Sequence, residues 1–235
     1  MPKTLGEKSS KRDVIITGAS KGIGAETAMI FAENSENLIL TYKDDKRGIE
    51  HIVDECKKRA KNNINIDFYQ LDLTKNESII KFYEEVTKKH KKIDVLINNA
   101  GYIQWKKLDE QSFEEIEMQI RTNLEGLIKL TKLFLPLLDK GMIINIASGA
   151  GKEGYATLST YCATKFGVRG FTQALAKEIS NIRVISVNPG MTSTRMTNFR
   201  GIHPRKVAEV IYKVSTSQIK PDANFDVDVW DHVLF

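Results

Sequence analysis

The stretch that decides the fold reads Val14-Ile15-Ile16-Thr17-Gly18-Ala19-Ser20-Lys21-Gly22-Ile23-Gly24. It is a short β-branched run that ends in a glycine-rich turn, and residues 25–32 continue at once with a helical pattern. Glycines let the backbone turn tightly and approach a ligand closely. The free amides and the positive dipole end of the following helix then face an anion. The stretch therefore predicts a strand, a phosphate-binding turn and a helix, although such turns also arise by chance.

Beyond this turn, the sequence alternates between strand and helix patterns. Further strands are expected at 38–42, 64–71, 94–97, 142–147, 184–187 and 225–229. Helices are expected at 45–60, 75–89, 112–138, 159–179 and 204–214, with Pro136 bending the end of the helix at 112–138. Strict alternation predicts one α/β domain over residues 1–235, of which residues 1–11 form a flexible tail. We expect a Rossmann-like, doubly wound parallel sheet of about seven strands with helices on both faces, and ligands at the carboxyl ends of its strands.

Composition excludes several classes of function. The chain of 235 residues has a formal net charge of +5. Its basic clusters at 57–59 and 88–92 lie at expected helix ends and contain no interleaved aromatic residues, so we expect solvated helix ends and no nucleic-acid partner. The two cysteines and four histidines show no ligand spacing, so we expect no metal. We find no signal peptide and no apolar run long enough for a membrane span, which predicts a cytoplasmic protein without a membrane partner.

Several polar residues fall where the expected strands end. Asn98 and Asn99 close the strand at 94–97, where amides serve either as structural support or as ligand contacts. Asn123 lies within an expected helix, where asparagine has poor propensity, so it either bonds a neighbouring loop or anchors a buried water. Ser148 follows the strand at 142–147, a place where serine is often only a turn residue.

Tyr161 and Lys165 lie four residues apart on an expected helix, so they share one face about a turn apart. The spacing alone is not specific, because two other Tyr-x-x-x-Lys pairs begin at residues 42 and 102. Only the pair at Tyr161 begins a helix just after a strand end that carries a serine.

Taken in order and spacing, these features resemble the short-chain dehydrogenase/reductase family in its compact single-domain form, in particular its 3-oxoacyl-[acyl-carrier-protein] reductase-like members. The resemblance covers about residues 12–215 and rests on residues 17–24, Asp72, residues 98–101, Asn123, Ser148, Tyr161, Lys165, Pro189-Gly190 and Thr192. The chain departs from the family at Ala147, where many members carry a second serine, and in a short segment after Thr194. Its C-terminal residues 226–230 also lack the family's glycine-rich ending.

The resemblance implies an enzyme that interconverts a carbonyl and an alcohol of a small molecule by hydride transfer. It implies Tyr161 as proton donor and acceptor, Ser148 as a hydrogen-bond donor to the carbonyl oxygen, Asn123 as support for a water, and Lys165 as a group that lowers the pKa of Tyr161 and bonds the nicotinamide ribose. One ammonium about 4 Å away, at an effective dielectric near 20, supplies the roughly 4 kcal/mol that lowers a phenol pKa by about three units. The implied cofactor-binding residues are Gly18, Ser20, Lys21, Gly22, Ile23, Gly24, Lys43, Asp72, Leu73, Asn99, Tyr161, Lys165 and Thr192.

The end of the second strand points to NADP(H) as the cofactor. A carboxylate there would bond the ribose hydroxyl of NAD and repel the 2′-phosphate of NADP, but the position holds Tyr42, followed by Lys43. Lys43 and Lys21 would clamp the 2′-phosphate, each with a charge-assisted bond. The alternative is that both lysines are only solvated. Asp44-Asp45 follows directly and is expected to cap the next helix.

The identity of the substrate is left open by the sequence. The candidate pocket residues are mostly apolar or aromatic: Tyr102, Gln104, Trp105, Tyr155, Met191, Met196 and Phe199. The helices at 112–138 and 159–179 carry apolar residues on more than one face, which predicts a homodimer or homotetramer; these residues are Leu127, Leu130, Leu133, Phe134, Phe166, Val168 and Phe171. The alternative function is a non-catalytic Rossmann-fold dinucleotide sensor, which would have no need of Ser148, Tyr161 and Lys165 together.

Overall fold

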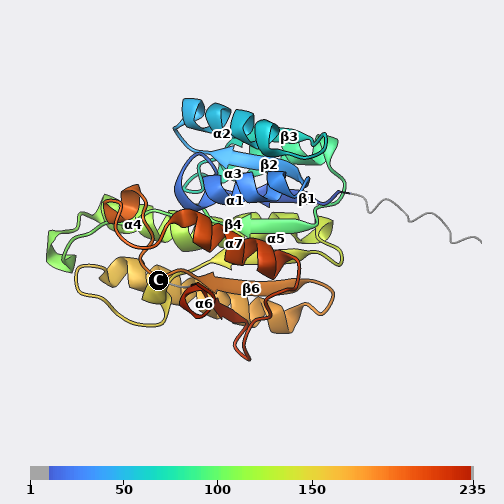
Figure 1. Cartoon of the computed structure of the whole chain (residues 1–235). Coiled ribbons are helices and arrows are strands. Elements are labelled where there is room, and N and C mark those ends of the chain that lie inside the picture. The colour runs from blue at the N-terminus through green and yellow to red at the C-terminus, as the bar shows by residue number, and fades with distance from the viewer. Residues whose placement is uncertain (1–10, 234–235) are drawn as a thin grey trace, which may run out of the picture.

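A computed structural model describes residues 11–233 of the chain. Seven parallel strands form one sheet in the order β3-β2-β1-β4-β5-β6-β7 (Figure 1). Their bounds are β1 (Asp13–Ile16), β2 (Asn37–Tyr42), β3 (Ile66–Gln70), β4 (Val95–Asn98), β5 (Met142–Ile146), β6 (Arg183–Asn188) and β7 (Asp226–Asp228). The order reverses between β1 and β4, and in sheets of this type the crevice at that point, outside the carboxyl ends of the strands, binds the ligand.

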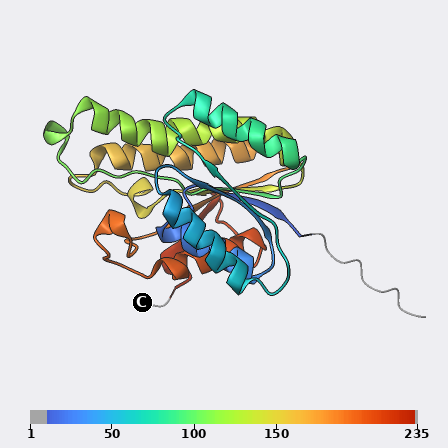
Figure 2. The ribbon, with the colours of Figure 1, turned by 90° about the horizontal axis from the view of Figure 1, so that it is seen from above.

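Helices cover both faces of the sheet, as Figure 2 shows from above. They are α1 (Gly22–Glu33), α2 (Lys46–Arg59), α3 (Asn76–Lys89), α4 (Phe113–Ile120), α5 (Gly126–Phe134), α6 (Ser159–Glu178) and α7 (Pro204–Ser215). The alternation of side chains along β1 explains the two layers. Val14 and Ile16 pack with α1, α2 and α7, whereas Ile15 packs with α3, α5 and α6. The predicted fold class is therefore confirmed.

The expected helix at 112–138 is wrong in one respect, because it is not continuous. A π-helical turn at Arg121–Glu125 separates α4 from α5, and a 3₁₀ turn at Leu135–Leu137 contains Pro136. Gly126 lies against the loop after β3, where a Cβ atom would stand 2.4 Å from the carbonyl oxygen of Leu73. Proline lacks the amide that would continue the α-helical bonds, which explains the tightened end. The other expected elements agree with the structure to within a few residues.

Two expected features concern the ends of the chain and the membrane. The predicted N-terminal tail, residues 1–11, lies outside the described residues except for Lys11. Within residues 11–233, no helix combines the length and apolar character needed to cross a membrane. The same residues contain no group of three or more His, Cys, Asp or Glu side chains placed to hold a metal ion.

Candidate functional site

The glycine-rich turn between β1 and α1 depends on its glycines in two ways. Gly18 and Gly22 have φ angles of +66° and +60°, a region that favours glycine. Gly24 is needed for close packing instead, because a Cβ atom there would lie 2.3 Å from the carbonyl oxygen of Gly18. The same atom would lie 2.5 Å from the Nδ2 atom of Asn99. The turn therefore holds the first amides of α1 at the carboxyl edge of the sheet.

The two asparagines at the end of β4 have different roles. Asn99 supports the turn: its Nδ2 donates to the carbonyl oxygens of Thr17 at 2.8 Å and Gly18 at 3.2 Å. Asn98 points into the protein, where its Nδ2 donates to Asn145 at 2.8 Å and Thr131 at 3.0 Å. Both asparagines therefore give structural support, and Asn99 also lines the cavity described next.

One cavity of about 1530 Å³ runs from the glycine-rich turn to the carboxyl ends of β5 and β6. Apart from Gly24 and Asn123, all of the expected site residues line it: Gly18, Ser20, Lys21, Gly22, Ile23, Lys43, Asp72, Leu73, Asn99, Ser148, Tyr161, Lys165 and Thr192. Gly24 does not line the cavity and instead packs closely against Gly18 and Asn99. The volume exceeds that of ordinary small-molecule pockets, and the turn leaves amides free for an anion, so the residues fit a dinucleotide.

The surroundings of Lys43 contain charges of both signs. Its Nζ atom lies 3.4 Å from Oδ1 of Asp72. Burial raises the pKa of Asp72, but hydrogen bonds from Thr74 and the charge of Lys43 outweigh it and hold the pKa below its ordinary value. The expected helix cap is correct for Asp45, which accepts a 2.9 Å hydrogen bond from the amide of Gly48. Asp44 is not the capping residue, and both aspartates line the cavity.

Ser148, Tyr161 and Lys165 meet at the other end of the cavity. Ser148 follows β5 and accepts a hydrogen bond from the amide of Ala150, which fixes the first turn after the strand. Tyr161 and Lys165 lie on the first turns of α6. Lys165 is only 5% exposed, and its Nζ donates to the carbonyl oxygen of Ile146 at 2.8 Å. Three groups from two elements that are separate in sequence therefore share one end of the cavity.

The pKa of Tyr161 differs from the expected, lowered value. Burial raises the pKa of Tyr161 to about 12, although the nearby Ser148 hydroxyl acts in the opposite direction. Burial also lowers the pKa of Lys165 to about 8. The expected lowering of the phenol pKa by Lys165 is wrong for the chain alone. The reason is geometric, because Nζ of Lys165 lies 5.6 Å from the centre of the Tyr161 ring and bonds a carbonyl oxygen instead.

Asn123 lies in the π-helical turn and holds the loop after β4. Its Oδ1 accepts from the amide of Tyr102 at 2.7 Å, and its Nδ2 donates to the carbonyl oxygen of Tyr102 at 2.8 Å. Nδ2 also reaches Oγ1 of Thr164 at 3.2 Å. Asn123 does not line the cavity. Of its two sequence interpretations, bonding to a neighbouring loop is the one that these contacts support.

The segment after β6, residues 192–202, which we call the lid loop, is closed at its base. The amide of Ser193 donates to Ile202 at 2.8 Å, and the amide of Ile202 donates to Met191 at 3.0 Å. Gly201 makes this closure possible, because its φ is +102° and a Cβ atom would lie 2.0 Å from the carbonyl oxygen of Met191. At the tip, Nε1 of Trp105 donates to the carbonyl oxygen of Met196 at 2.7 Å.

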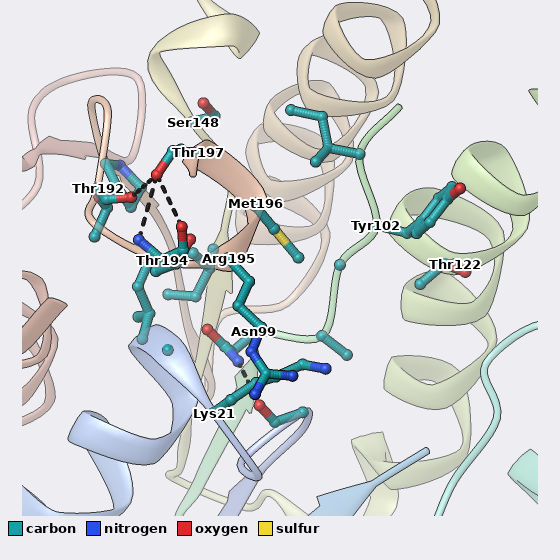
Figure 3. Close-up of a pocket in the computed structure, with 18 of the residues that line it drawn as sticks. Lys21, Asn99, Tyr102, Thr122, Ser148, Thr192, Thr194, Arg195, Met196 and Thr197 are labelled. Carbon is teal, nitrogen blue, oxygen red and sulfur yellow. Dashed lines mark hydrogen bonds between the residues drawn. The ribbon is translucent and has the colours of Figure 1, made fainter. Parts of the chain in front are cut away.

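Six of the seven expected substrate-pocket residues line the cavity, and two of them, Met196 and Phe199, come from the lid loop; Figure 3 shows Tyr102 and Met196 among the lining residues. Gln104 does not line it and instead accepts a 2.9 Å hydrogen bond from the Tyr102 hydroxyl. Sequence reasoning missed Arg195, which lines the cavity from the lid loop. The feature of the sequence that could have indicated Arg195 is its position soon after Thr192, an expected cofactor-binding residue. The expected pocket residues that do line the cavity are Tyr102, Trp105, Tyr155, Met191, Met196 and Phe199.

Comparison with known proteins gives consistent matches. A family model described as short chain dehydrogenase matches residues 12–203. An NADP-dependent 3-hydroxy acid dehydrogenase of Schizosaccharomyces pombe is 33% identical over 230 residues, which cover 95% of this chain and 86% of that protein. A 3-oxoacyl-[acyl-carrier-protein] reductase of Thermotoga maritima is 35% identical over 188 residues, which cover 78% and 75%.

Solved structures match as well. The alcohol dehydrogenase of the archaeon Thermococcus sibiricus, complexed with 5-hydroxy-NADP, has a TM-score of 0.83 and 25% identity. The match covers 93% of this chain and 96% of that one. Levodione reductase, at 22% identity, has a TM-score of 0.85 and shares the fold.

Proposed function

Since this chain belongs to the short chain dehydrogenase family, we propose that it is an NADP(H)-dependent oxidoreductase that interconverts a carbonyl and an alcohol. The observation that carries the proposal is that Ser148, Tyr161 and Lys165 share one cavity with the glycine-rich turn. A dinucleotide whose phosphates lie at the turn would extend along this cavity toward the three side chains. NADP(H), when bound, supplies or accepts the hydride.

Two side chains act on the oxygen of the reacting carbonyl. The Ser148 hydroxyl donates a hydrogen bond to this oxygen as negative charge develops on it, as an oxyanion donor does. The Tyr161 hydroxyl delivers a proton to the same oxygen, and it takes the proton back in the reverse direction. Because burial places the pKa of Tyr161 at about 12, the phenol is fully protonated near neutral pH and is ready to donate.

Lys165 makes the loss of that proton easier. Burial lowers its pKa to about 8, which is still above neutral pH, and its positive charge stabilises the developing phenolate. We also assign Lys165 a bond to the nicotinamide ribose. Asn123 acts as a positioning residue that holds the loop at Tyr102. A Cβ atom at Gly101 would lie 3.5 Å from Oδ1 of Asn123 and 3.9 Å from Nζ of Lys165, so Gly101 leaves the space where a water would join them.

The substrate end of the cavity favours an uncharged carbonyl compound with an apolar group. Its walls include Tyr102, Trp105, Met196 and Phe199. The cavity is lined by four cations among the described residues, and none is available for a substrate carboxylate. Lys21 and Lys43 lie on the cofactor side, Lys165 serves the reaction, and Figure 3 shows Arg195 directed toward Lys21. A carboxylate buried without a partner is costly.

The experiment compares two matched substrates with NADPH. Ethyl 3-oxobutanoate and free 3-oxobutanoate differ in the charge beside the same ketone. We expect kcat/KM for the ester to exceed that for the acid by at least about tenfold. Preference for the acid would contradict the substrate class. Tight NADP+ binding with no turnover on any aldehyde or ketone of a broad panel would contradict catalysis and favour a dinucleotide sensor.

Self-association and a cytoplasmic location complete the proposal. The apolar residues expected to join subunits are mostly core residues, because Leu127, Leu130, Phe134 and Val168 are buried in the chain itself. Phe113 on α4 and Phe166 on α6 are 81% and 45% exposed, however, and α4 and α6 are in contact. We propose that these two helices form the contact of a homodimer or homotetramer. The buried free cysteines Cys56 and Cys162 suit a reducing cytoplasm.

A further inference from the structure

The lid loop lies against the start of α1. Gly22 is the first residue of α1, and a Cβ atom there would lie 3.3 Å from Cγ2 of Thr194. Thr194 precedes a short 3₁₀ turn, Arg195–Thr197, so Arg195 is the first residue after this contact. The loop is held in place on the other side by the hydrogen bond from Trp105 to Met196. Arg195 is therefore carried by a loop that lies beside the glycine-rich turn.

The side chain of Arg195 extends from the lid loop toward Lys21 and Asn99 (Figure 3). Among residues 11–233, neither Arg195 nor Lys21 takes part in a salt bridge, whereas other cations of the chain do. By contrast, Arg169 is paired with Asp226 and Arg205 with Glu33. Both side chains are exposed to solvent at the cavity, and an anion placed between them would be attracted by both charges.

We propose that Arg195 binds the diphosphate of NADP(H) from the side opposite Lys21, so that the lid loop contributes directly to cofactor binding. The inference rests on the proposed function, because the diphosphate belongs to that cofactor. The location argues for the diphosphate, since dinucleotide folds hold it at the N-terminus of the helix after β1, where Thr194 meets Gly22. Guanidinium also suits phosphate oxygens, because it presents paired donors in one plane.

The other anionic group of NADP(H) is its 2′-phosphate. The positions of the 2′-phosphate and the diphosphate lie at different strands of the sheet, so they can be told apart. The 2′-phosphate belongs at the end of β2, where Lys43 lies beside Asp72. The lid loop instead follows β6, three strands away from β1 in the sheet order, and it reaches α1 at Gly22. Arg195 therefore strengthens the binding of NADP+ and NAD+ alike, whereas Lys43 distinguishes between them.

The test measures dissociation constants of NADP+ and NAD+ by calorimetry, without any substrate. Arg195→Gln should raise the dissociation constants of both ligands by the same factor, about tenfold. The dissociation constants of Arg195→Lys should lie between those of Arg195→Gln and the wild type. The affinity should also become less sensitive to salt in Arg195→Gln. The matched control is Arg200→Gln, an exposed arginine of the same loop that does not line the cavity, and it should bind like the wild type.

The outcomes separate the inference from the function on which it rests. Unchanged binding of both ligands by Arg195→Gln would overturn the inference while the proposed cofactor stands. Weaker binding of NADP+ alone would overturn the assignment to the diphosphate, because that pattern belongs to a residue that contacts the 2′-phosphate. A wild-type protein that binds no NADP+ would overturn the proposed function, and the inference with it. Circular dichroism and thermal unfolding of each variant exclude misfolding as the cause.

Discussion

The ammonium nitrogen of Lys165 lies 5.6 Å from the centre of the Tyr161 ring, and its hydrogen bond goes to the carbonyl oxygen of Ile146. The lysine thus lies near the ring but gives the phenol hydroxyl no hydrogen bond. The surroundings favour the neutral phenol, whose pKa is about 12. The chain alone therefore holds Tyr161 as a proton donor, and any lowering of its pKa must come with the bound cofactor and substrate.

Tyr161→Phe should lower kcat by about 10²–10⁴-fold, because it removes the proton donor and keeps the ring. The affinity for NADP+ should change little. Turnover and calorimetry measure the two effects separately. Tyr83→Phe is a matched control on α3, where Tyr83 packs against Phe134 and does not line the cavity. A Tyr161→Phe enzyme with nearly normal kcat would refute the assigned role.

The buried Lys165 should make stability depend on pH in a defined range. Its pKa falls from 10.5 to about 8 on folding, so below pH 8 the burial cost is fully present. Between pH 8 and 10.5 the unfolded chain binds more protons, and stability rises with pH. The pKa of Tyr161 rises from 10 to about 12, which acts in the opposite direction only above pH 10.

Lys165→Met isolates this contribution. Between pH 8 and pH 10, the free energy of unfolding of the wild type should rise relative to that of the variant by about 2 kcal/mol. Urea unfolding at both pH values measures the difference. Burial also raises the pKa of the Cys56 thiol to about 12. Its contribution to the pH dependence of stability is the same in both proteins and therefore cancels in the comparison. A wild-type-to-variant difference that is constant with pH would show that Lys165 does not titrate in this range.

Gly24→Ala should damage the phosphate-binding turn. The added Cβ would lie 2.3 Å from the carbonyl oxygen of Gly18, so the turn must move, at a cost of about 1–3 kcal/mol in stability. Binding of NADP+ should be lost together with this shift. Gly154→Ala is the control, because a Cβ atom there meets nothing within 4 Å. Thermal unfolding and calorimetry compare the two, and equal behaviour would contradict the packing role.

Lys43→Ala should reduce the preference for NADPH over NADH. Removing the charge at the end of β2 costs a charge-assisted contact to the 2′-phosphate, which we expect to lower the ratio of kcat/KM values about tenfold. Lys46→Ala removes a neighbouring lysine whose side chain is 68% exposed, and it should leave the ratio unchanged. A wild type that favours NADH, or an unchanged ratio in Lys43→Ala, would remove Lys43 from the 2′-phosphate site.

Charges introduced on α4 and α6 should prevent self-association. Phe113→Glu combined with Phe166→Glu places one carboxylate on each of the two helices at an exposed apolar position, and burying them in a subunit contact is costly. Sedimentation at micromolar concentration should show an oligomer for the wild type and a monomer for the double variant. Ile80→Glu on α3 is the control, since Ile80 is also exposed. A monomeric wild type would contradict the proposal.

Local sequence determined most of the fold. The β-branched run at 14–16, the glycines at Gly18 and Gly22, and the alternation of strand and helix patterns each report on backbone preferences over a few residues. Such preferences are short-range, so they can be predicted from the sequence without knowledge of tertiary contacts. Ser148 follows a strand, and Tyr161 and Lys165 begin the next long helix, so the sequence also indicates that all three lie near the carboxyl end of that strand. In the structure all three line the same cavity.

Only the tertiary structure decided what these residues touch. It separated Asn98, which bonds the core, from Asn99, which supports the glycine-rich turn, and it gave Gly24 a packing role. It directed the Lys165 hydrogen bond to Ile146 and brought Arg195 to the start of α1. These contacts join segments that are far apart in sequence, and the strand order and crossovers of the sheet bring such segments together. A pattern of neighbouring residues therefore does not predict which distant segments come into contact.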